Sequence, residues 1–201
     1  MRLEPNPGPS KCDPLMPYAD ALWFSVLLDT SVLYPMYLRD TLLRVAEQGL
    51  YRPLWSQHIL GELARSLRDS AGIESDKVGG LVRLMASQFP DSEVNSYEAL
   101  IESIELPDPD DRHVVAAAVK GGAGVIVTAN VRDFPSDLEE RYGVSVQSPD
   151  DFLLERLDED PNVVRAAVSE QVRPYANPPM TIDELLDRLG LPGFAAAVRS
   201  G

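Results

Sequence analysis

Polar residues follow directly after short apolar runs in this chain, and these runs alternate with segments of helical spacing. The clearest case is the mostly apolar run over residues 24–28, which ends on Asp29 and two small hydroxyl residues, Thr30 and Ser31. A run of this length is typical of a strand buried on both faces, as in a parallel sheet covered by helices. An aspartate at its carboxyl end would face the crevice where open α/β sheets bind ligands. The alternative role for Asp29 is a cap on the next helix.

The same alternation continues to about residue 150. Residues 125–127 predict a second buried strand that ends on Thr128, and shorter strands are expected at residues 51–55 and 144–146. Apolar residues at helical spacing predict helices between them, at about residues 35–48, 57–67, 75–88, 97–104 and 112–120. Strands that alternate with helices indicate a doubly wound parallel sheet, and so an α/β fold.

After residue 150 the pattern predicts helices alone. Pro161 is expected to open one of them, and Thr181 with Glu184 forms a capping box that starts another. We therefore expect three parts, namely a proline-rich, disordered lead-in over residues 1–20, an α/β domain over residues 21–150 and a small all-helical C-terminal extension over residues 151–201.

Composition and charge limit the function classes. The 201-residue chain has a formal net charge of −14 at pH 7, which argues against a protein that grips nucleic acid through a broad basic surface. It does not exclude a nuclease whose acids gather at a metal site. The single cysteine, Cys12, excludes an intrachain disulfide framework, so we expect a cytoplasmic protein. No apolar run approaches transmembrane length, so no membrane partner is expected.

Acids recur at three further places. Glu62 lies inside the apolar stripe of its helix, where glutamate is rare unless it has a partner or a function, and the alternative is a flank residue that snorkels to water. Asp108, Asp110 and Asp111 crowd the start of an alanine-rich helix, where acids complement the macrodipole and cap free N–H groups. That local role accounts for Asp108 and Asp110. Asp133 follows the second buried strand.

Together, Asp29, Glu62, Asp111 and Asp133 indicate a cation site. Carboxylates brought close together repel one another unless a cation neutralises them. Oxygen-only ligands favour Mg²⁺ or Mn²⁺ over zinc, and such an ion can activate water and neutralise charge on a phosphodiester. We expect His113 to be a packed or surface histidine and not a metal ligand, because no second histidine stands at ligand spacing.

With these residues, the chain resembles the PIN domain family of metal-dependent ribonucleases, and in particular the VapC-type toxins of prokaryotic toxin–antitoxin pairs. The likeness runs from about residue 24 to residue 152. It rests on Leu28-Asp29-Thr30-Ser31-Val32, on Gly61-Glu62-Leu63, on the Asp-Pro-Asp-Asp run that leads into the alanine-rich helix, and on residues 128–134. The resemblance implies a PIN-like α/β/α sandwich with a central parallel sheet. The helices after residue 150 are similar to an extension of some VapC-like proteins.

The resemblance also implies a set of site residues. Asp29, Glu62 and Asp111 fall on the family's three recurrent metal-site acids, and Asp111 is chosen because it stands three residues before the apolar–alanine run. For the fourth position, which is either Asn130 or Asp133, we expect Asp133 with Asn130 as a supporting polar ligand. The residues expected to orient the acids are Ser31 and Thr128.

The reaction implied is hydrolysis of RNA phosphodiester bonds by a metal-dependent endoribonuclease, the toxin of a type II toxin–antitoxin pair. Asp29 and Asp111 would be the principal ligands of Mg²⁺ or Mn²⁺. Glu62 would bind the metal or position the water, and Asp133 would complete a second, weaker metal site, so that one or two ions are possible. The implied partners are the RNA substrate, a cognate antitoxin protein and a second copy of the chain in a homodimer.

Two other functions fit parts of the pattern. A PIN fold can serve as a binding module without nuclease activity, which is expected where acids are lost, and here all four are present. A haloacid-dehalogenase-like phosphatase also places an acid after its first strand, in the pattern Asp-x-Asp. In this chain Ser31 stands where that enzyme has its second acid, so the general acid would be missing.

Overall fold

The fold is a five-stranded parallel sheet with helices on both faces. The computed structural model describes residues 24–201, and both Cys12 and the expected lead-in over residues 1–20 lie outside the described part. The strands are β1 (Ser25–Leu28), β2 (Arg52–Ser56), β3 (Glu93–Val94), β4 (Val125–Val127) and β5 (Ser145–Gln147). They lie in the order β3-β2-β1-β4-β5, and every neighbouring pair is parallel. The predicted α/β class with a central parallel sheet is confirmed.

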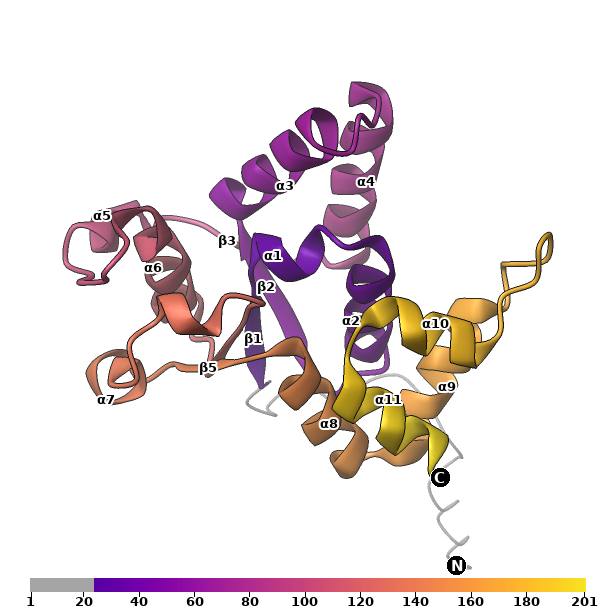
Figure 1. Cartoon of the computed structure of the whole chain (residues 1–201). Coiled ribbons are helices and arrows are strands. Elements are labelled where there is room, and N and C mark those ends of the chain that lie inside the picture. The colour runs from indigo at the N-terminus through magenta and orange to yellow at the C-terminus, as the bar shows by residue number, and fades with distance from the viewer. Residues whose placement is uncertain (1–23) are drawn as a thin grey trace, which may run out of the picture.

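Helices connect the strands and cover the two faces of the sheet. With α6 on one side and α2 on the other, the arrangement is an α/β/α sandwich, while α3 and α4 project together beyond the sheet (Figure 1). The helices up to residue 142 are α1 (Thr30–Leu33), α2 (Met36–Glu47), α3 (Gln57–Asp69), α4 (Ser75–Gln88), α5 (Glu98–Ile101), α6 (Arg112–Gly121) and α7 (Leu138–Tyr142), with short 3-10 helices η1 (Pro109–Asp111) and η2 (Val131–Asp133).

The packing of the core explains why α6 is rich in small residues. Its residues Ala116, Ala117 and Ala118 are fully buried, and at Gly121 the helix backbone comes very close to the sheet. A Cβ atom at Gly121 would lie 2.8 Å from side-chain atoms of both Leu54 and Val94. Small side chains therefore allow α6 to lie flat on β2 and β3, which fixes the position of its first turn at the opposite end.

Two features of the sheet differ from the sequence expectation. Strand β3 was not predicted, because two residues are too short for a periodic pattern. A proline is uncommon inside a central strand, yet Pro53 lies inside β2. The N–H of Arg52 points to β1, where it donates to Phe24 O at 2.9 Å. An N–H at position 53 would point to the opposite side of the strand, toward β3. The pairing on that side begins two residues later, where Trp55 N donates to Ser92 O. No ladder bond is lost.

The chain ends in helices that pack beside α2. These are α8 (Pro149–Glu159), α9 (Pro161–Val172), α10 (Ile182–Leu189) and α11 (Pro192–Arg199), and they gather on the α2 side of the sheet (Figure 1). The helix opened by Pro161 and the capping box at Thr181 are confirmed. Helix α11 was not predicted, and its first turn is capped by Asp150, which accepts from Gly193 N and Phe194 N at 3.0 and 2.7 Å.

Among residues 24–201, no helix combines the length and the apolar composition needed to span a bilayer. The division of the chain into separate domains at residue 150 stays a prediction.

The close approach at Gly121 leads to a stability prediction. Gly121→Ala should lower the free energy of unfolding by about 1–3 kcal/mol, because the new methyl group meets two buried side chains in a packed core. The matched control is Gly80→Ala in α4, where a Cβ atom meets nothing within 4 Å. That change should stabilise the protein by about 0.5–1 kcal/mol through helix propensity. Urea unfolding of the two variants should therefore shift in opposite directions, and equal shifts would contradict the packing described.

Candidate functional site

The predicted acids meet at the carboxyl edge of the sheet, beside the two central strands. From β1 the chain builds β2 and β3 on one side and then returns to place β4 and β5 on the other. Ligands in open α/β sheets bind at such a reversal of strand order. A cleft of about 440 Å³ opens here, and Asp29, Glu62, Asp111, Ser31 and Asn130 all line it. Three predicted acids from three separate segments are thus brought together.

A larger hollow of about 780 Å³ lies elsewhere. Its lining includes Arg52 at the start of β2 and Glu93 at the start of β3, which places it at the amino edge of the sheet. None of the predicted site acids lines it, so size does not identify the site in this protein.

Asp29 is held by donors from the segments that follow both central strands. Its carboxylate accepts from Thr30 N at 2.7 Å, from Ser31 Oγ at 2.6 Å and from Thr128 Oγ1 at 2.8 Å. The predicted helix-capping role and the predicted orientation by Ser31 and Thr128 therefore coexist, since Asp29 is also the N-cap of α1. A carboxylate with this many donors has one defined position.

The two hydroxyl groups also bind the loop that follows β4. Each uses its one proton for Asp29, so its lone pairs remain free to accept. Ser31 Oγ accepts from Ala129 N at 2.9 Å, and Thr128 Oγ1 accepts from Asn130 N at 3.1 Å. The loop carrying Asn130 is thereby tied to the carboxylate at the end of β1.

Glu62 projects from α3 and is positioned by partners on two other helices, α1 and α6. Thr30 Oγ1 donates to its Oε2 at 2.7 Å, and His113 Nε2 lies 3.3 Å from its Oε1. Burial alone would raise the pKa of Glu62, but the hydrogen bonds from His113 and Thr30 outweigh burial and lower it. Glu62 is therefore an ionised carboxylate at neutral pH. Its partners are not Arg65 or Arg68, the two arginines nearest to it along the helix.

His113 is packed, as predicted, but it is not alone. It is 4% exposed, and the ring of His58 stacks on it with the centroids 3.9 Å apart. His58 is a turn before Glu62 on α3, so the second histidine comes from another helix and not from nearby sequence. Burial and the neighbouring His113 lower the pKa of His58, which favours the neutral ring.

Asp111 differs from the other two acids because no helix N–H group is bound to its side chain. It is the N-cap of α6 by position, without a side-chain capping bond. Burial raises its pKa to about 6, and the carboxylates of Asp108, Asp29 and Asp133 act in the same direction while His113 opposes them. Asp111 thus combines the cost of burial with the repulsion of three neighbouring carboxylates.

Asp108 and Asp110 fit the local role expected for them. Asp108 caps η1 by accepting from Asp110 N at 2.9 Å, and Asp110 is exposed to solvent. Neither lines the cleft that holds Asp29.

The fourth predicted acid lies beside the cleft and not in its lining. Asp133 is exposed at the end of η2 and lines a neighbouring hollow of about 490 Å³ with Asp108 and Arg132. It is close enough to raise the pKa of Asp111. Asn130 lines the cleft itself.

Sequence reasoning missed two residues that contact the site. Thr30 was noted only as a small hydroxyl residue, although its position directly after Asp29 was a usable signal. His58 carries no signal of its own, because its contact with His113 depends on how α3 and α6 pack.

The electrostatics of Asp111 lead to a prediction about stability and pH. Because its folded pKa of about 6 lies above its ordinary value of 3.8, stability falls as the pH rises through this window and stays lowered above it. Asp111→Asn should raise the free energy of unfolding by about 1 kcal/mol at about pH 7 without metal, a modest value because solvent screens a partly exposed group. Near pH 4 the gain should be much smaller.

Urea unfolding in chelator at both pH values measures the effect. Asp110→Asn is the control and should change stability little at either pH, because Asp110 is exposed. An equal gain from both substitutions would show that general surface charge is responsible.

Comparison with known proteins gives two family matches and one similar protein. The profile of the PIN domain matches residues 25–132, and that of the VapC50 C-terminal domain matches residues 149–200. A protein of Mycobacterium tuberculosis named "Putative ribonuclease VapC50" is 46% identical over 91 residues, which are 44% of this chain and 54% of that protein. The chain thus spans about half the length of this curated relative. No solved structure matches.

The PIN domain match covers more than half of the chain and includes Asp29, Glu62 and Asp111. It covers strands β1 to β4 and every residue that lines the cleft, and the second match begins where α8 begins. This chain belongs to the PIN domain family.

Proposed function

We propose that this chain is a metal-dependent endoribonuclease that hydrolyses RNA phosphodiester bonds and acts as the toxin of a type II toxin–antitoxin pair. The observation that carries the proposal is the cleft at the strand reversal of a PIN domain, lined by Asp29, Glu62 and Asp111. The name of the similar protein, a ribonuclease, supports RNA as the substrate.

The donor set fits a hard divalent cation. The acids offer oxygen ligands only, which suit Mg²⁺ or Mn²⁺. The raised pKa of Asp111, caused by burial and by three neighbouring carboxylates, is an unfavourable repulsion that a cation would relieve. Asp29 and Asp111 would be the principal ligands, with Glu62 as a further ligand or as the residue that positions water.

When bound, the ion would supply a lowered pKa for a coordinated water and neutralise charge on the phosphodiester. The chain's own residues prepare the site for this. Ser31 and Thr128 hold Asp29 in one orientation by donating to it. Thr30 and His113 do the same for Glu62 and keep it ionised.

The fourth position has two candidates with different locations. Asp133 carries the charge expected of a ligand for a second, weaker ion, and it acts electrostatically on Asp111. Asn130 carries no charge but lines the cleft and is tied to Asp29 through Thr128. We retain Asp133 as the fourth acid and Asn130 as the supporting ligand, with roles that the experiments below separate.

Arg132 lines the hollow beside the acids. Arg141 forms ion pairs with Glu105 and Asp137. Lys120 lies at the C-terminal end of α6, far from the acids at its first turn. At that end the carbonyl of Gly121 accepts from Arg52 of β2 at 3.5 Å. Arg132 is therefore our candidate for a phosphate contact. The antitoxin partner, the homodimer and the cytoplasmic location stay predictions.

The decisive experiment is cleavage of a structured RNA panel in Mg²⁺ and in Mn²⁺. Asp29→Ala and Asp111→Ala should abolish cleavage, because each removes a proposed ligand. Asp111→Ala should retain the fold, whereas Asp29→Ala should also lower the free energy of unfolding, because Ser31 and Thr128 lose their acceptor. Asp110→Ala is the matched control, an exposed acid one residue from Asp111, and should keep nearly full activity. Asp108→Ala should cost at most about 0.5–2 kcal/mol of stability through the lost cap, with cleavage retained.

Equal loss in Asp108→Ala and Asp111→Ala would show that the third acid is misassigned. An intact protein that binds the ion but cleaves no RNA would favour the binding-module alternative.

The two candidates for the fourth position should separate by metal dependence. Asp133→Ala should raise the Mg²⁺ concentration needed for half-maximal cleavage, because it removes a charge, and leave the saturated rate similar. Asn130→Ala should lower the saturated rate more, because Asn130 lines the cleft. The reverse pattern in a Mg²⁺ titration would exchange their roles.

A further inference from the structure

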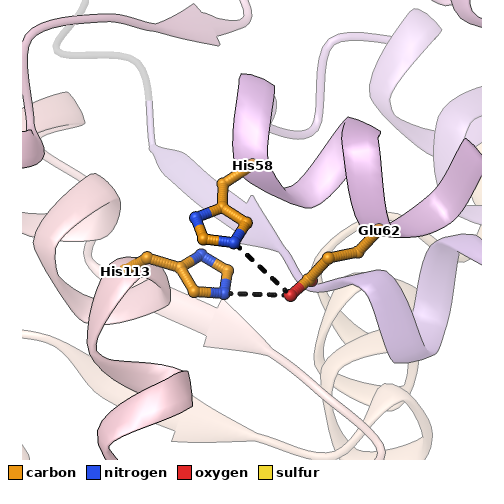
Figure 2. Close-up of side chains that lie close together, drawn as sticks. All are labelled: His58, Glu62 and His113. Carbon is orange, nitrogen blue, oxygen red and sulfur yellow. Dashed lines mark ion pairs between the residues drawn. The ribbon is translucent and has the colours of Figure 1, made fainter. Parts of the chain in front are cut away.

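Both histidines of the chain converge on one carboxylate oxygen at the side of the cleft. The sequence contains two histidines in all. His113 Nε2 and His58 Nε2 lie 3.3 and 3.9 Å from Glu62 Oε1, and Figure 2 shows both rings turned toward that atom. One ligand atom from each of the three residues falls within 4.8 Å of the others. His58 and Glu62 come from α3, and His113 comes from α6.

We propose that His58, His113 and Glu62 form a binding site for a borderline divalent transition metal such as Zn²⁺ or Co²⁺. Imidazole nitrogens suit such ions, whereas Mg²⁺ prefers oxygen ligands. Three protein ligands, two nitrogens and a carboxylate oxygen, are the number found in zinc sites that keep one position open. This site is distinct in chemistry from the oxygen cleft but shares Glu62 with it.

The geometry combines one fixed ligand with one adjustable ligand. His113 is buried, and its position is set by α6 and by the hydrogen bond to Glu62. The side chain of His58 is half exposed, so it can close the remaining distance without disturbing the core. The rings are stacked nearly parallel, with an interplanar angle of 14°. The half-exposed ring of His58 must therefore tilt out of the stack for both Nε2 lone pairs to point at one ion.

The second ring nitrogen of His113, Nδ1, limits how tightly the site can bind a metal ion. Nδ1 is buried and has no hydrogen-bond partner. With Nε2 carrying the proton that is donated to Glu62, Nδ1 can stay bare. Metal at Nε2 moves that proton to Nδ1 or to solvent, and Nδ1–H lacks the acceptor that metal-bound histidines usually have. The site should therefore bind metal reversibly and not act as a permanent structural centre.

The test uses the fact that every histidine in the chain belongs to the proposed site. In tag-free, ¹⁵N-labelled full-length protein, imidazole signals come from His58 and His113 alone. Titration with ZnCl₂ should shift the Nε2 signals of both residues. MgCl₂, which prefers oxygen ligands, should leave that of His58 nearly unchanged and shift that of His113 much less, through Glu62 alone. Zinc calorimetry on the same samples gives the affinity.

The matched variant is His58→Phe, which keeps an aromatic ring stacked on His113 and removes the ligand nitrogen. It should weaken zinc binding roughly tenfold or more and remove the zinc response of His113. The second variant, Asp111→Asn, removes a charge from the oxygen cleft. It should retain the zinc response of both rings while the stabilisation by Mg²⁺ is lost.

Three results would overturn the site. The first is an unchanged zinc affinity in His58→Phe. The second is loss of the imidazole response in Asp111→Asn, which would place zinc in the oxygen cleft. The third is the absence of an imidazole shift in the wild type. The inference rests on the proposed function only through the shared Glu62. Failure of that function would appear as absent RNA cleavage with the zinc response intact, so the two failures are distinguishable.

Discussion

The carboxylate of Asp29 joins the two central strands at the point where their backbone pairing ends. Asp29 N donates to Val127 O at 3.1 Å, which is the last backbone bond between the ends of β1 and β4. Beyond it, Ser31 and Thr128 continue the link through their hydroxyl groups. Hydrogen bonds to a charged group contribute about 1.5–3 kcal/mol each, so this small network is a substantial part of what holds the carboxyl edge together. The cleft exists in its observed shape because this edge is fixed.

The same edge concentrates negative charge, and the cost is distributed unevenly. Asp29 and Glu62 each accept hydrogen bonds from neighbouring side chains or backbone. Asp111 has the repulsion without such donors, and its pKa rises to about 6. The electrostatic strain of the cluster is therefore carried mainly by one residue at the start of α6. A cation near Asp111 would relieve the repulsion between these carboxylates and favour the ionised form of Asp111.

Much of the fold was predictable because it follows from local patterns. The buried runs that became β1 and β4, the Ser56 cap on α3 and the capping box at Thr181 each depend on residues close together in sequence. Strand β3 and the place of Pro53 inside β2 were not predictable in this way. Both depend on which backbone groups a neighbouring strand leaves unpaired, and this is a property of the assembled sheet.

The residues of the candidate site also differ in whether local sequence or tertiary packing determines their position. Asp29 and Asp111 were predictable as cleft residues, because strand ends and helix starts meet at one edge of a parallel sheet. Glu62 lies inside α3 and was predicted from its place in an apolar stripe and from the family resemblance. The separation of Asn130, in the cleft, from Asp133, beside it, depends on the turn of η2 and carries no sequence signal. The contact between His58 and His113 is a consequence of helix packing. Histidine spacing along the chain could therefore not reveal it.

The C-terminal helices contribute to the same architecture. Asp29 begins α1, and the carbonyl groups at the end of α1 accept from buried Arg39 of α2. On its other side α2 meets α9, where Thr41 donates to fully buried Gln171 at 2.7 Å and Gln171 donates back to Tyr37 O at 2.9 Å. Polar contacts on two sides of α2 thus connect it to α9 and to the helix that Asp29 caps. Because an unpaired buried polar group is costly, α9 and α2 constrain each other, and the helices after residue 150 help to fix the element that begins the cleft.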